Sequence, residues 1–71
     1  PPQGSVVYHW SCAKIREADA TVSDEALLEK LRTRLTMGSS AAAKPCVAEI
    51  AAEAHRVGRQ RLATMLLEQV R

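Results

Sequence analysis

Two histidines and two cysteines are the side chains that could hold a metal ion. They are His9, Cys12, Cys46 and His55. His9 and Cys12 lie three residues apart and could share a zinc ion on one helix, whereas Cys46 and His55 lie nine apart. On a helix nine residues span about 13 Å, which is too long for one tetrahedral site. The spacing therefore predicts no metal, and we expect two reduced, half-buried thiols.

Cys12 and His9 could also act as a thiol nucleophile and its general base. Nucleophilic catalysis further needs a group that orients the base and donors that stabilise the developing charge. The three glycines are scattered and form no phosphate-binding loop. The sequence therefore predicts a non-enzymatic protein without catalytic residues, bound metal, cofactor or small-molecule substrate.

The densest basic cluster lies around Gly58 and contains Arg56, Arg59 and Arg61. A helix, a turn with glycine and a second helix also outline a DNA-binding helix-turn-helix. However, the formal net charge is only +2, and acidic residues precede and follow the cluster. Those acidic residues are Glu49, Glu53 and Glu68. We interpret the arginines as solvated charges at a helix corner, and a small helix-turn-helix nucleic-acid-binding domain is the alternative.

The amino-acid composition of the chain predicts an all-α fold, whose helices would position these side chains. Hydrophobic residues make up 46% of the 71, yet only Tyr8 and Trp10 are aromatic, so alanine and leucine supply most apolar surface. Alanine and leucine favour helices over strands. No stretch reaches the roughly 18 apolar residues of a membrane span, and residues 1–4 do not resemble a signal peptide. We expect a cytoplasmic chain.

The first half of the chain predicts a helical hairpin over about residues 6–36. Its first helix covers about 6–18, and Trp10 in the middle of the apolar face is expected to lie in the core. Its second helix begins after Ser23, a good N-cap, with acidic residues in the first turn. The apolar stripe of this helix contains Leu27, Leu28, Leu31 and Leu35.

A second hairpin is predicted over about residues 46–70, after a Gly-, Ser- and Ala-rich linker over about 37–45. Its first helix opens at Pro45 and ends before Gly58, which suits a left-handed C-terminal cap. The apolar stripe of this helix contains Val47, Ile50, Ala51, Ala54 and Val57, and the stripe of the following helix contains Leu62, Ala63, Leu66, Leu67 and Val70. Small alanines at facing positions let helices approach closely, as in stacked helix-pair repeats. Residues 1–71 are therefore predicted to be one helical fragment, two antiparallel hairpins of an α-solenoid.

Two stretches of sequence also carry a family resemblance. They are His9-Trp10-Ser11-Cys12-Ala13-Lys14 with Ser23-Asp24-Glu25, and Glu49-Ile50-Ala51 with Ala54, Gly58-Arg59, Leu62-Ala63 and Leu66-Leu67-Glu68. In order and spacing they resemble the vacuolar protein sorting-associated protein 16 family where its C-terminal helical region begins. The run between Met37 and Cys46 departs from the shorter Pro-Gly turn and Ser-rich helix start of that family.

The resemblance implies a subunit of the class C core shared by the endosomal and vacuolar tethering complexes. Such a subunit combines a β-propeller with an α-solenoid, and a Sec1/Munc18-type subunit binds elsewhere in the full chain. The expected function is a non-enzymatic scaffold in endosome-to-vacuole or lysosome vesicle fusion and protein sorting. The expected location is peripheral at those membranes, and no partner-binding residue is assigned.

Overall fold

The computed structural model describes residues 3–37 and 43–69, and within them the fold is all-α, as predicted. The described residues form four helices and no strand. The helices are α1 (Gln3–Glu17), α2 (Asp24–Met37), α3 (Ala43–Arg56) and α4 (Gln60–Glu68).

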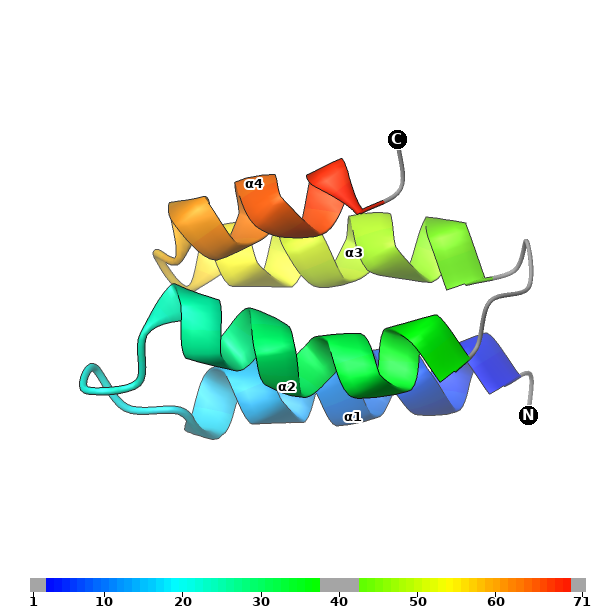
Figure 1. The fold of residues 1–71 in the computed structure, drawn as a ribbon, viewed down its shortest axis with the longest axis horizontal. Coiled ribbons are helices and arrows are strands. Elements are labelled where there is room, and N and C mark those ends of the chain that lie inside the picture. The colour runs from blue at the N-terminus through cyan, green and yellow to red at the C-terminus, as the bar shows by residue number, and fades with distance from the viewer. Residues whose placement is uncertain (1–2, 38–42, 70–71) are drawn as a thin grey trace.

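The helices form two antiparallel hairpins that lie in two layers. Hairpin one contains α1 and α2, and hairpin two contains α3 and α4 (Figure 1). Across the layers, α1 packs on α3 and α2 packs on α4. The contact between α3 and α4 is the most extensive, and α1 contacts α3 more extensively than it contacts α2.

Two helix boundaries lie where the sequence predicts them, namely the start of α2 and the end of α3. Ser23 caps α2, because its hydroxyl oxygen accepts a 3.1 Å hydrogen bond from the backbone N–H of Ala26. Gly58 has a φ of +88°, in the left-handed region that glycine adopts without strain. The N–H groups of Gly58 and Arg59 donate to the carbonyls of His55 and Ala54, at 3.0 and 2.8 Å, which completes a Schellman cap of α3.

Other boundaries differ from the predictions. Helix α1 begins at Gln3 rather than near residue 6, and α3 begins at Ala43, so Pro45 is not its first residue. Proline is tolerated there because backbone N–H groups of the first turn have no partner within the helix. Residues 37 and 43–45 of the predicted linker are therefore helical, and its residues 38–42 lie outside the described residues, as does Val70.

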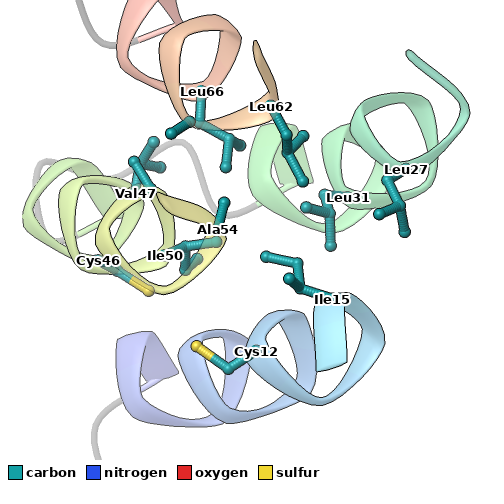
Figure 2. Packing of buried hydrophobic residues seen from close by; sticks show 12 residues of the cluster. Cys12, Ile15, Leu27, Leu31, Cys46, Val47, Ile50, Ala54, Leu62 and Leu66 are labelled. Atoms are coloured by element: carbon teal, nitrogen blue, oxygen red, sulfur yellow. The ribbon is translucent and has the colours of Figure 1, made fainter. Parts of the chain in front are cut away.

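The core lies where the two hairpins meet, and leucine, isoleucine and alanine dominate it (Figure 2). Its buried apolar residues are Cys12, Ile15, Leu27, Leu31, Cys46, Val47, Ile50, Ala51, Ala54, Leu62, Ala63 and Leu66. Two members of the predicted stripes are exposed instead, Val57 at 38% and Leu67 at 45%. Val57 belongs to the corner that follows α3, and Leu67 lies on a side of α4 that no described helix covers.

Candidate functional site

Arg59 joins the start of α4 to the loop between α1 and α2. Its guanidinium donates to the backbone carbonyls of Val22 and Asp19, both at 2.8 Å, and to a carboxylate oxygen of Asp24 at 2.7 Å. The side chains of Arg59 and Asp24 are only 15% and 18% exposed. The planar guanidinium can satisfy three acceptors at once because its N–H groups point in fixed directions. Arg59 therefore ties hairpin two to hairpin one.

Two further arginines of the predicted basic cluster pair with carboxylates. Arg61 donates to Glu25 of α2 at 2.6 Å, and Arg56 donates through Nε to Glu53 on its own helix at 3.0 Å. Glu53 also pairs across the layers with Arg16 of α1, at 3.4 Å. Hydrogen bonds from Arg56 are the main reason why the pKa of Glu53 lies below its usual value.

The interpretation of these arginines as solvated corner charges is therefore wrong for Arg59, although Arg56 and Arg61 are mostly exposed. The side chain of Glu53, one of the acidic residues near the cluster, is only 12% exposed. Each arginine of the cluster is neutralised by an acidic neighbour at hydrogen-bond distance. Pairing of this kind reduces the positive potential that attracts a nucleic-acid backbone.

The candidate metal-ligating residues are not brought together as one site. His9 and His55 are exposed, while Cys12 and Cys46 are buried, at 1% and 7% exposure rather than half buried. Among residues 3–37 and 43–69, no three potential ligands are close enough to hold a metal ion. Figure 2 shows the two sulfur atoms turned toward the space between α1 and α3.

Burial also makes Cys12 a poor nucleophile. Desolvation raises the pKa of the Cys12 thiol and of the Cys46 thiol, so less of each is present as reactive thiolate at neutral pH. Cys12 interacts with Tyr8, and their hydrogen bond is the main cause of the raised pKa of the Tyr8 hydroxyl. His9, the candidate base for Cys12, instead places its ring centroid 5.2 Å from that of Tyr8, edge to face.

Trp10, which the sequence places in the core, lies at the edge of it. The ring is partly buried and packs against the core cluster. Two cations cover it, Arg34 with its guanidinium carbon 4.8 Å from the ring centroid and Lys14 with its ammonium 5.9 Å away. Cation–π contacts suit such a half-buried site, where the ring is apolar and the cations keep water contact. Trp10 is thus partly covered by charged side chains of its own hairpin.

The most distinctive open surface is a groove of about 500 Å³ between α3 and α4, which we call the outer groove. Its lining residues are Ala48, Ala51, Ala52, His55, Gln60, Ala63, Thr64 and Leu67. None of them is an acid, a lysine or an arginine. At 100° per residue, Ala48 and Ala52 lie on the opposite side of α3 from Cys46, which faces α1. The outer groove is therefore on the face of hairpin two that points away from hairpin one.

The corresponding hollow between α1 and α2 has a different chemistry. Its lining residues are Lys14, Glu17, Ala18, Asp19, Val22, Ala26, Leu27 and Lys30. Half of these are charged, and Lys14 pairs with Glu17 at 2.9 Å. By the same helical geometry, Lys14 lies on the opposite side of α1 from Cys12 and so faces away from hairpin two. The outer hollow of hairpin one is thus half lined by charged residues, whereas no acid, lysine or arginine lines the outer groove of hairpin two.

Comparison with known proteins identified no matching family model, no matching curated protein and no matching solved structure. Within the described parts of the chain, no helix combines the length and apolar character needed to cross a membrane.

Sequence reasoning missed the two residues that connect the hairpins most directly, Arg59 and Glu53. One signal was available for Arg59: it directly follows the glycine that ends α3, at the corner of hairpin two. Their pairing could not be read from spacing, because 35 residues separate Arg59 from Asp24. The outer groove was also missed, since Ala51 and Ala63 belong to the predicted core stripes while Ala48 and Ala52 lie outside them.

Proposed function

We propose that this chain is a non-enzymatic scaffold segment in which helical hairpins stack, as in the opening units of an α-solenoid. The observation that carries the proposal is the layering: α1 packs on α3, and α2 packs on α4. Stacked helix-pair repeats bury their apolar faces in this way, each pair against its neighbour. A charged outer face on hairpin one supports the proposal further, because terminal repeats carry a polar outer face.

The cellular role proposed for this scaffold is vesicle tethering in endosome-to-vacuole or lysosome fusion. It is supported by the resemblance of the His9–Lys14 and Glu49–Glu68 stretches to the vacuolar protein sorting-associated protein 16 family. The partners would be other tethering-complex subunits, including a Sec1/Munc18-type subunit bound elsewhere in the full chain. The location would be cytoplasmic and peripheral at endosome and vacuole or lysosome membranes.

The tethering role can be tested by tagging the native polypeptide that carries residues 1–71 and identifying the proteins that co-purify. Tethering-complex subunits should be enriched over an untagged control. Arg59→Ala, which removes the tie between the hairpins, should reduce their yield more than the matched control Arg61→Ala. Purification without any tethering subunit would refute this role.

Nucleic-acid binding is the competing function, and the same arginines discriminate it. A helix-turn-helix domain would lose duplex-DNA affinity when Arg59 and Arg61 become alanine, with a strong salt dependence. Because the arginines of the corner pair with carboxylates, we expect no such binding. Fluorescence anisotropy of labelled duplex DNA at low salt measures this binding directly. If the chain binds DNA in a salt-sensitive way and the double variant does not, the helix-turn-helix function would replace the scaffold proposal.

A further inference from the structure

We propose that Cys12 and Cys46 form a reversible disulfide between α1 and α3, which locks the two hairpins together under oxidising conditions. The two residues lie on helices that pack directly against each other, and both are present as thiols. Figure 2 shows the sulfur atom of each cysteine pointing toward the other across the contact between α1 and α3. The Cys12 thiol also acts electrostatically on Cys46, which agrees with this closeness.

The packing of α1 on α3 has the spacing that a disulfide needs. The axes of packed helices lie roughly 8–10 Å apart, so facing Cα atoms lie roughly 4–7 Å apart. A disulfide joins Cα atoms that are roughly 4.4–6.8 Å apart. Further along the same two helices, Arg16 pairs with Glu53 at 3.4 Å. The disulfide would therefore join two surfaces that already meet.

The surroundings of the two cysteines restrict what other chemistry they can perform. Cys12 and Cys46 are 1% and 7% exposed, so a large substrate cannot reach either sulfur in the folded chain. In the described part of the chain, no third ligand lies near enough to complete a metal site with them. Each thiol is thus the reaction partner that the fold offers to the other.

The reaction needs an oxidant, and a small disulfide such as oxidised glutathione supplies it. Cys46 is the more exposed of the two residues, so its thiolate attacks a sulfur of the small disulfide and releases one small thiol. The Cys12 thiolate then attacks the Cys46 sulfur of this mixed disulfide and releases the second small thiol. The protons of both cysteines end on the released thiols, and two electrons pass from the protein to the small disulfide.

Burial makes this reaction slow but its product stable. Because desolvation raises the pKa of both thiols, little thiolate is present at neutral pH, and the contact between α1 and α3 must open briefly for the oxidant to enter. Once formed, the bond closes a loop that contains the whole of α2 and so restricts the unfolded chain. The cross-link would then hold hairpin one on hairpin two until a reducing thiol removes it.

Equilibrium in mixtures of reduced and oxidised glutathione tests the proposal on the unsubstituted chain. Mass spectrometry should find a monomer that has lost two hydrogen atoms, with Cys12 and Cys46 joined in one digested fragment. The effective concentration of the two thiols should be about a hundredfold or more greater in buffer than in urea, because the fold holds the sulfur atoms together. Oxidation should raise the melting temperature by roughly 10 °C or more, and dithiothreitol should reverse this rise.

The equilibrium is approached from two sides, so that slow exchange of buried thiols is not mistaken for a lack of pairing. One sample starts from the reduced chain, and the other from chain that was oxidised in urea and then refolded. Cys12→Ala and Cys46→Ala are the matched controls: each should form only a mixed disulfide with glutathione, and oxidation should not raise its melting temperature. Equal effective concentrations in buffer and urea, a cross-linked chain that melts below the reduced chain, or disulfides only between separate chains would each overturn the proposal.

Discussion

Hairpin two closes through the three residues 57–59, whereas hairpin one needs the six residues 18–23 to join its helices. The α3–α4 contact is the most extensive in the molecule, but α1 and α2 contact each other less than each contacts hairpin two. Alanines allow the close approach of α3 and α4, and Ala51 and Ala63 are buried where these helices meet. Hairpin two is thus held together by the contact between its own helices. The arrangement of α1 and α2, by contrast, depends largely on their packing against hairpin two.

The loop of hairpin one shows the same dependence. The carboxylate of Asp19 accepts hydrogen bonds from the hydroxyl of Thr21 and from its backbone N–H, the latter at 2.9 Å. These bonds are the main cause of the lowered pKa of Asp19, and they form a local Asx turn. Arg59 donates to the carbonyls of Asp19 and Val22, and the Asp19 carbonyl also accepts from the backbone N–H of Val22 at 3.2 Å. A side chain of hairpin two therefore completes the hydrogen bonding of a loop in hairpin one.

The largest effect is expected from Ile50→Ala, because Ile50 is fully buried in α3 between the layers. Removing its side chain should cost about 2–5 kcal/mol. The whole domain has roughly 4–11 kcal/mol of stability by the usual value per residue. Urea unfolding should be followed by helical circular dichroism and by the fluorescence of Trp10, the only tryptophan in the chain. Both midpoints should fall together, since hairpin one depends on hairpin two.

The control for this variant is Leu28→Ala, which removes a partly buried leucine of hairpin one. Its midpoint should fall less than that of Ile50→Ala. If Trp10 fluorescence kept its original midpoint in Ile50→Ala, hairpin one would be independent of hairpin two, contrary to the comparison.

Arg59→Ala comes next, because it removes three hydrogen bonds between the hairpins. We expect a loss of about 1–3 kcal/mol, since hydrogen bonds to charged groups are worth more than neutral ones. Arg61→Ala is the control: the Arg61 and Glu25 side chains are 69% and 56% exposed, and exposed pairs contribute little. Equal losses in the two variants, measured by urea unfolding, would show that burial of Arg59 is unimportant.

Gly58→Ala tests the corner that makes hairpin two compact. Apart from the glycine and its two chain neighbours, no residue has a heavy atom within 4 Å of the position that a Cβ would occupy, so the cost comes from the backbone φ of +88°. A non-glycine residue in the left-handed region costs about 1–2 kcal/mol. Gly58→Asn should lose less stability, because asparagine tolerates that region better. If thermal unfolding shows that Gly58→Asn is less stable than Gly58→Ala, the left-handed Schellman cap does not determine the corner.

The smallest effect is expected from acid, through the ion pairs that Glu53 and Glu25 form with arginines. Arginine partners lower the pKa of Glu53 and of Glu25 below 4.5, the ordinary value for glutamate. A carboxyl whose pKa is lowered by folding adds stability at pH values above its unfolded pKa, and this stability is lost as the pH falls through the folded pKa. The urea midpoint should therefore decline below about pH 4.5. Glu53→Gln should weaken this decline, and an identical pH profile in that variant would contradict the assignment.

Much of the fold could be predicted from the sequence, because the signals are local. Leucine and alanine spacing identified the helices, and Ser23 and Gly58 identified two of their ends correctly. The early start of α3 at Ala43 was missed, since alanines beside Gly and Ser read equally well as a linker. Helix boundaries depend on a few weak preferences, whereas a full apolar stripe sums many.

Candidate surfaces were predicted less well, because they depend on which faces meet. Local spacing established that Arg59 follows a helix-ending glycine and that Asp24 opens a helix. Only the stacking of the layers decided that these two side chains meet, with 35 residues between them. Stacking also decided which alanines of the outer groove are buried and which are exposed. Ala48 and Ala51 differ by only 60° around the helix. The position of α4 alone decides that Ala48 is exposed and Ala51 is buried.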